Sequence, residues 1–117
     1  MADMNGSILD SIKKNLGIVP EYTAFDDQII LDINAAFSTL HQLGFGPDEG
    51  FEITGIDEFW SDIIEEPRFN FIKSYVCMKV RVMFDPPTSS YALDALNKQI
   101  AEYEWRIKSQ IETGGTE

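Results

Sequence analysis

Few side chains in this 117-residue sequence could carry chemistry, because it contains only one histidine, His41, and one cysteine, Cys77. Nucleophilic catalysis needs a nucleophile beside a base, and a metal centre needs a set of ligands. A lone cysteine forms no disulfide within one chain, and its apolar neighbours Val76 and Met78 predict a buried thiol. His41 falls in the last turn of an expected helix, where its partial positive charge is favourable. We therefore expect neither residue to be catalytic.

Carboxylates and glycines gather in residues 44–58, whose sequence is GFGPDEGFEITGIDE. The acidic residues lack the alternating ligand spacing of a calcium loop. The glycines lack both the lysine and hydroxyl of a Walker-type loop and the spacing of a dinucleotide fingerprint. We interpret this segment as a solvated acidic loop and expect no metal ion and no cofactor. Paired-carboxylate chemistry stays open, because it would show as a strongly raised carboxyl pKa in a cleft.

The charge is unevenly distributed along the chain. Residues 1–66 contain 14 acids and 2 bases, whereas residues 67–117 contain 6 acids and 7 bases, so that −12 and +1 sum to the net charge of −11. Binding nucleic acid through its phosphates needs clustered lysine and arginine, which this chain lacks. The acids either keep the protein soluble, or they suit head-to-tail association or a surface that repels a polyanion.

Length and composition predict one compact domain, with 44% apolar and 25% charged residues. We place this domain at residues 1–112 and a flexible tail at residues 113–117. No apolar run approaches the roughly 20 residues of a membrane span, and the N-terminus lacks the features of a signal peptide. We therefore expect no membrane partner and a protein of the cytosol or of an assembly formed there.

Helical periodicity dominates the first half of the chain. Residues 7–16 predict a short amphipathic helix, with Asn5 or Ser7 as the N-cap and Gly17 as the stop. Residues 26–43 predict a long helix, because isoleucine, phenylalanine and leucine recur there at intervals of three and four. Thr23 is its predicted cap, and the acids of its first turn favour the positive helix end.

The middle of the chain is harder to assign. Residues 57–64 predict a short helix whose apolar side chains turn toward the core: Phe59, Trp60, Ile63 and Ile64. Residues 76–84 alternate like a strand, although the stripe Phe69, Ile72, Val76, Val80 and Met83 recurs at helical spacing. About 18 residues from Pro67 onward contain no turn signal and exceed a typical strand, so we predict a helix over 67–84.

The stretch FDPPTSSY, residues 84–91, separates this helix from the next. A residue before proline is pushed out of the helical region, so Asp85 and Pro86 end the preceding helix. Thr88, Ser89 and Ser90 are three candidate caps for the next one. We interpret the stretch as a rigid corner that aims the final helix.

That final helix is predicted over residues 90–111. A narrow apolar seam runs along it at intervals of three and four: Leu93, Leu96, Ile100, Tyr103 and Ile107. Trp105 lies off the seam, so it either anchors a partner or covers a neighbouring helix of the same chain. Glu102 with Arg106 and Glu104 with Lys108 are spaced for ion pairs along the helix surface.

Four segments together resemble the small head–tail connector proteins of tailed bacteriophages, also called adaptor or DNA-packaging proteins. They are LHQLGFGPDEGF, WSDII, VCMKVRVMFDPPTSSYAL and AEYEWRI. The resemblance extends from about Ser7 to Ile107, and FDPPTSS followed by Glu-Trp-Arg is its most specific part. The resemblance implies an all-α fold, which favours helix over strand at residues 76–84. The whole pattern predicts a small bundle of about four to five helices with a long last helix after the Pro-Pro corner.

The resemblance also implies a structural function in the neck of a phage or prophage virion, assembled in the host cytoplasm. Such connectors form a ring under the portal, extend the DNA channel and offer a surface to the next neck or tail component. Double-stranded DNA would pass through the lumen without specific binding. We expect the interface to a neighbouring subunit or to the portal on the last helix, at Tyr91, Leu96, Tyr103, Trp105 and Arg106.

An alternative function is that of a small acidic interaction protein, for example a nucleic-acid mimic that blocks a basic partner. A monomer with a regular acidic stripe would favour this alternative, whereas ring-shaped oligomers would favour the connector.

Overall fold

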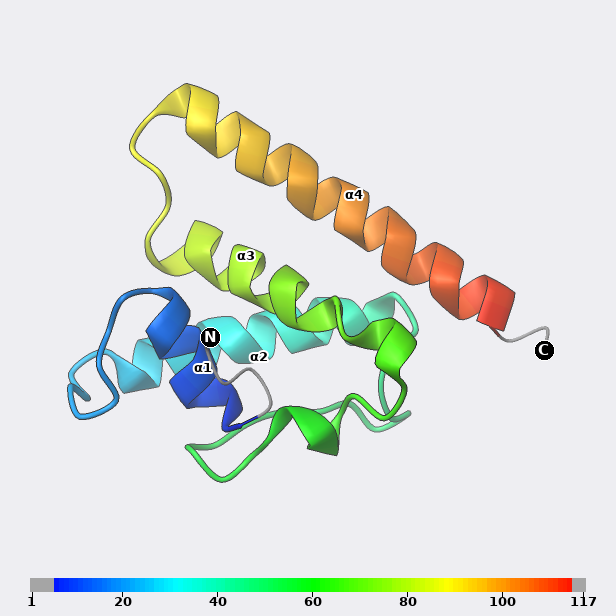
Figure 1. The fold of residues 1–117 in the computed structure, drawn as a ribbon, viewed down its shortest axis with the longest axis horizontal. Coiled ribbons are helices and arrows are strands. Elements are labelled where there is room, and N and C mark those ends of the chain that lie inside the picture. Colours follow the sequence, from blue (N-terminus) through cyan, green and yellow to red (C-terminus); the bar gives the residue numbers. More distant parts are fainter. Residues whose placement is uncertain (1–5, 115–117) are drawn as a thin grey trace.

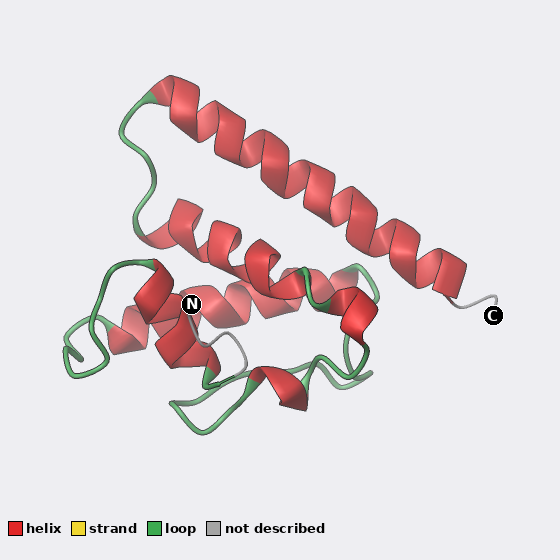
Figure 2. Cartoon of the chain, viewed as in Figure 1, coloured by secondary structure: helices red, strands yellow, loops and turns green. Residues whose placement is uncertain are grey.

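A computed structural model describes residues 6–114 as four α-helices with two short 3-10 turns between the second and third (Figures 1 and 2). The elements are α1 (Ile8–Asn15), α2 (Asp26–Gln42), η1 (Trp60–Asp62), η2 (Pro67–Phe69), α3 (Ile72–Phe84) and α4 (Ser90–Gly114). The described residues contain no strand, so the predicted all-α fold is confirmed. α3 packs against all three other helices, and α4 lies on the side of α3 away from α1 and α2 (Figure 1).

α1 begins where its cap was predicted, because the Ser7 hydroxyl accepts a hydrogen bond from the Asp10 amide at 3.4 Å. Asn5, the other candidate cap, lies outside the described residues. Lys13, in the last turn of α1, is buried, with its ammonium 2.8 Å from the Asp26 carboxylate and 2.9 Å from the Pro20 carbonyl oxygen. This lysine therefore ties the α1–α2 loop to the core.

The prediction that Thr23 caps α2 is wrong. α2 begins at Asp26 after Phe25, without a side-chain cap, and only the Thr23 carbonyl is engaged, by the Asp26 amide at 3.2 Å. Since Asp26 is bound to Lys13, the start of α2 depends on a partner in α1 that local sequence does not reveal. Its end is as predicted, with Gly44 adopting φ +101, a conformation that favours glycine.

The predicted helix over residues 57–64 is wrong in extent, because only Trp60–Asp62 form a 3-10 turn. The preceding backbone is extended and bound to the start of α1, where the Ile8 amide donates to the Glu58 carbonyl at 3.0 Å. Phe59 is consequently 43% exposed, contrary to prediction, whereas Trp60, Ile63 and Ile64 are buried as predicted.

The glycine-rich loop before η1 is held against α2 by the Asn34 side chain. Its amide nitrogen donates to the Ile53 carbonyl at 3.0 Å, and its oxygen accepts from the Ile53 amide at 2.8 Å. One side chain thus satisfies both backbone groups of a loop residue, much as a neighbouring strand would.

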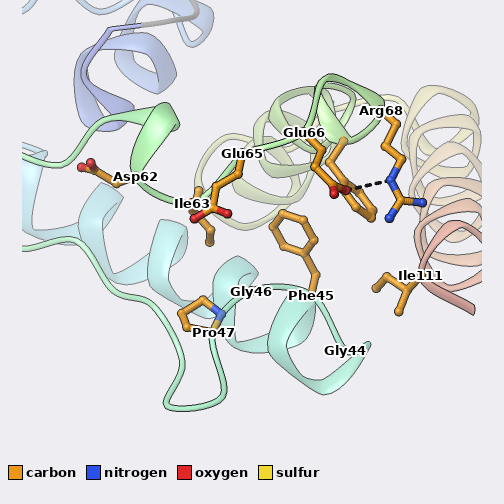
Figure 3. A pocket seen from close by; sticks show the side chains of 11 residues that line it. Gly44, Phe45, Gly46, Pro47, Asp62, Ile63, Glu65, Glu66, Arg68 and Ile111 are labelled. Atoms are coloured by element: carbon orange, nitrogen blue, oxygen red, sulfur yellow. Dashed lines mark hydrogen bonds and ion pairs between the residues drawn. The ribbon is translucent and has the colours of Figure 1, made fainter. Parts of the chain in front are cut away.

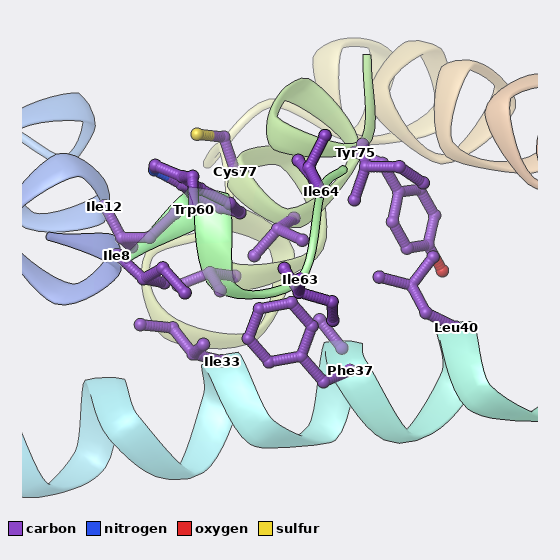
Figure 4. Close-up of a cluster of buried hydrophobic side chains, with 14 of the residues drawn as sticks. Ile8, Ile12, Ile33, Phe37, Leu40, Trp60, Ile63, Ile64, Tyr75 and Cys77 are labelled. Carbon is purple, nitrogen blue, oxygen red and sulfur yellow. The ribbon is translucent and has the colours of Figure 1, made fainter. Parts of the chain in front are cut away.

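Residues 76–84 are helical, as predicted, although the predicted single helix over 67–84 is interrupted between η2 and α3. Four members of the predicted stripe are buried, but Met83 is 40% exposed near the end of α3. The core gathers apolar side chains from α1, α2, α3 and the η1 region around Trp60 and Phe37 (Figure 4).

The Pro-Pro corner ends α3 at Asp85, whose backbone leaves the helical region at φ −149 and ψ 68. Of the three hydroxyl residues predicted as caps, Ser89 caps α4, because its side-chain oxygen accepts a hydrogen bond from the Ala92 amide at 3.2 Å. α4 then runs to Gly114 and includes the first two residues of the predicted flexible tail, whereas residues 115–117 lie outside the described residues.

Candidate assembly interface

α4 is attached to the rest of the protein along one stripe, the predicted seam. Ile100 and Ile107 are buried, while Leu93, Leu96 and Tyr103 are half-buried. Most residues on the side of α4 opposite this seam are exposed, Trp105 among them.

A hydrogen bond between α3 and α4 sets the rotation of the helix about its own axis. The hydroxyl of Tyr75, which is completely buried, donates to the Glu104 carboxylate at 2.7 Å, and Lys79 lies 3.8 Å from the same oxygen. Burial raises the pKa of Tyr75, and the neighbouring Glu104 raises this pKa further, so the phenol remains a donor at neutral pH. With Glu104 turned toward α3, the seam faces inward and the opposite side of α4 faces outward.

The two ion pairs predicted along α4 do not form between these described side chains. Glu104 is bound to Tyr75 and Lys79 instead of Lys108. The Arg106 guanidinium lies 5.1 Å from the ring centres of both Phe71 and Tyr103. Cation–π contacts thus hold Arg106 against the α3 side of the helix.

Replacing Tyr75 with phenylalanine is expected to lower the free energy of unfolding by about 1.5–3 kcal/mol, as for hydrogen bonds to charged groups. The substitution removes the hydroxyl that donates to Glu104 and keeps the buried aromatic ring. Urea unfolding of the wild-type and variant proteins measures the difference. Tyr91→Phe is the matched control, because Tyr91 is 84% exposed and should leave stability unchanged. Equal effects of the two substitutions would contradict the role of the Tyr75–Glu104 bond.

Trp105 is the clearest candidate for an anchor on the outward side, with 70% of its side chain exposed. It borders a shallow hollow of about 260 Å³, together with Arg68, Phe71, Arg106, Ser109 and Gln110. Two guanidinium groups and two aromatic rings thus meet at one place. We call these six residues the Trp105 surface.

A second hollow, of about 490 Å³, shares Arg68 with the first (Figure 3). Its apolar lining includes Phe45, Phe69 and Ile111, and its carboxylates are Asp62, Glu65 and Glu66. Arg68 lines both hollows, and it is held by Glu66, 2.8 Å from its Nε, and by the Gln110 carbonyl, which accepts from its Nη1 at 3.3 Å.

The five residues predicted for the interface do not form one cluster. Trp105 and Arg106 border one hollow, and the Arg106 guanidinium reaches the ring of Tyr103, which lies in the seam. Tyr91 is exposed about 21 Å before Trp105 along α4, at a rise of 1.5 Å per residue. Leu96 is half-buried in the seam. Their roles in assembly stay predictions. Sequence reasoning missed Arg68 and Phe71, which come to Trp105 only through the packing of α4 on the start of α3.

The residues considered for catalysis, Cys77 and His41, lie apart from one another in the fold, on α3 and α2. Cys77 is buried, as predicted, and burial raises the pKa of its thiol to about 11, which keeps it protonated at neutral pH. His41 Nε2 lies 2.9 Å from the Asp48 carbonyl oxygen. Burial raises the pKa of Asp32 above its ordinary value, and a hydrogen bond from Gln28 offsets part of this increase. Asp32 lines neither of the two hollows beside α4. In residues 6–114, no group of three or more His, Cys, Asp or Glu side chains is arranged to hold a metal ion.

The described residues form a small all-helical protein with an exposed tryptophan on its last helix and two hollows beside that helix. A family model described as phage connector protein matches residues 8–114, so the chain belongs to the phage connector protein family. No curated protein and no solved structure matches the chain. Within the described part of the chain, no helix is long and apolar enough to span a membrane.

Proposed function

We propose that this protein is a head–tail connector that assembles as a ring between the portal and the tail and extends the DNA channel. Its partners would be further copies of itself, the portal protein and the next neck or tail-completion protein. Membership of the phage connector family supports this function. The observation that carries the assembly part is the outward side of α4, where Trp105 is 70% exposed on a helix attached along a single stripe.

The net charge of −11 supports a passive relation to DNA. Carboxylates on the lumen of a ring would repel the phosphate backbone, so DNA would pass without specific binding. The protein would be located in the virion neck after assembly in the cytoplasm of the bacterial host.

Trp105→Ala is expected to weaken assembly about 30-fold, the effect of losing a 2 kcal/mol interface hot spot. A large indole buried between subunits would lose its contact area, whereas the fold would be unaffected. Co-sedimentation with purified portal rings measures binding, and electron micrographs show whether rings form.

Leu31→Ala is the control for this experiment, since Leu31 is equally an exposed apolar residue, 64% accessible, but lies on α2. It should leave co-sedimentation unchanged. Unchanged binding of Trp105→Ala would remove Trp105 from the interface. A wild-type protein that stays monomeric beside portal rings and binds a basic protein tightly would instead support the acidic interaction protein.

A further inference from the structure

Exposed apolar side chains gather where the α1–α2 loop meets the end of α3. Tyr22 and Phe25 stack edge to face at 5.7 Å, and Phe25 contacts Phe84 at 5.4 Å between ring centres. We call this surface the aromatic corner, which comprises Val19, Tyr22, Phe25, Met83 and Phe84. Four of these side chains are 40–60% exposed, and only Phe84 is half-buried. An exposed cluster of this kind typically marks an interaction site.

The aromatic corner is held in place by the buried Lys13. Its ammonium binds the Pro20 carbonyl on one side of the loop and the Asp26 carboxylate on the other. The segment that carries Tyr22 and Phe25 is therefore fixed to α1 at both ends. A preorganised loop loses little conformational entropy when a partner binds.

The rim of the aromatic corner is acidic. Glu21, Asp27 and Asp85 are exposed and lie within two residues of its rings in the sequence. Arg81 is the basic residue nearest in the chain, and its Nε is occupied by the Asp85 carbonyl oxygen at 2.7 Å. A partner for this surface should combine aromatic or apolar area with positive charge.

Exposed positive charge is scarce on this protein, and four of the six exposed bases among the described residues lie on α4 or beside it. Two copies with a net charge of −11 repel each other, so a stable contact between copies should place bases of one against acids of the other. Lys13 is buried in its ion pair and Lys79 faces Glu104. The exposed bases on α4 or beside it are Arg68, which is also paired with Glu66, and Lys98, Arg106 and Lys108, whereas Lys14 and Arg81 are exposed elsewhere.

The Trp105 surface and the aromatic corner lie at opposite ends of the molecule. Figure 1 shows the second half of α4 at the right, and the α1–α2 loop and the end of α3 at the left. Two different surfaces at opposite ends can pair head to tail, and such heterologous contacts close into a ring when the rotation between copies permits.

We propose that the aromatic corner of one copy receives the Trp105 surface of the next copy. Trp105 would stack on Tyr22 and Phe25, while the guanidinium groups of Arg68 and Arg106 would face the carboxylates of the rim. This pairing rests on the proposed ring assembly and names the two surfaces that form it.

Photo-crosslinking tests the pairing directly. A benzoylphenylalanine at position 105 keeps a large aromatic group there and is illuminated in assembled protein, free or bound to portal rings. Mixing nitrogen-15-labelled and unlabelled copies identifies crosslinks between copies by mass spectrometry. We expect crosslinks to residues 19–27 or 83–85 of a second copy, and a reciprocal benzoylphenylalanine at position 22 should reach residues 98–109. Crosslinks only to the portal or to other segments would overturn the pairing.

A charge exchange supplies an independent measurement. Glu21→Arg and Arg106→Glu, each alone, should reduce assembly at least tenfold in sedimentation velocity, and the double variant should recover most of it. A double variant no better than the worse single variant would overturn the proposal. If wild-type rings form but these results fail, the pairing is wrong while the connector function stands. If wild-type protein neither forms rings nor binds portals, both proposals fail.

Discussion

Trp60→Ala is expected to lower the free energy of unfolding by about 3–5 kcal/mol, the usual range for removing a large aromatic side chain from a core. Trp60 is 1% exposed and contacts Phe37 edge to face, with ring centres 6.4 Å apart (Figure 4). It also joins the extended segment before η1 to α1 and α2. Since domains are stable by only about 5–15 kcal/mol, this loss should leave the variant marginally folded. Urea unfolding followed by circular dichroism measures it.

The second tryptophan of the chain provides the control. Trp105→Ala removes the same side chain from an exposed position and should change stability by less than about 0.5 kcal/mol. Trp60→Phe should be milder than Trp60→Ala, because the Trp60 indole N–H has no hydrogen-bond partner among the described residues. If both alanine variants lose the same stability, Trp105 packs within the protein and the outward side of α4 is not free.

Lys13→Ala is expected to lower the free energy of unfolding by about 3 kcal/mol, at the lower end of the range for breaking a buried ion pair. The lysine is 1% exposed, whereas Asp26 keeps 22% of its side chain accessible, which moderates the loss. Removal of the ammonium leaves the Asp26 carboxylate and the Pro20 carbonyl without this partner. Thermal and urea unfolding both measure the effect.

Lys14→Ala is the matched control for the lysine experiment. Lys14 is the next residue in α1, carries the same charge and is exposed, so its removal should be nearly neutral. Equal losses in the two variants would mean that helix propensity or net charge, and not the buried pair, determines the result. The Lys13 variant should also loosen the aromatic corner, which limited proteolysis within residues 19–25 would detect.

The proposed assembly function rests on the positions of two surfaces and not on reactive groups. α4 is aligned by Tyr75 and Glu104, and this alignment turns Trp105 outward. The α1–α2 loop is anchored by Lys13 and presents its rings to the solvent. In both places a buried polar contact holds an exposed apolar group in a defined direction, which suits the proposed assembly.

Local sequence predicted three of the helices and the end points that depend on neighbouring residues, while the all-α class also drew on the resemblance to phage connectors. Ser7 caps α1, Gly44 ends α2 and the two prolines end α3 because these effects act within a turn of the chain. The apolar seam of α4 was also predictable, since residues three and four apart share one face of any helix.

Only the tertiary structure determined the contacts between segments that are distant in the sequence. Thr23 does not cap α2, because α2 starts at Asp26, which is bound to Lys13 of α1. Phe59 is exposed because its backbone pairs with that of Ser7. Glu104 bonds to Tyr75 rather than to a lysine on its own helix. The aromatic corner likewise exists only because Phe25 and Phe84 come together from distant segments. Periodicity specifies which side of a helix is apolar, but the partner of a charge or an exposed ring is chosen by packing between segments.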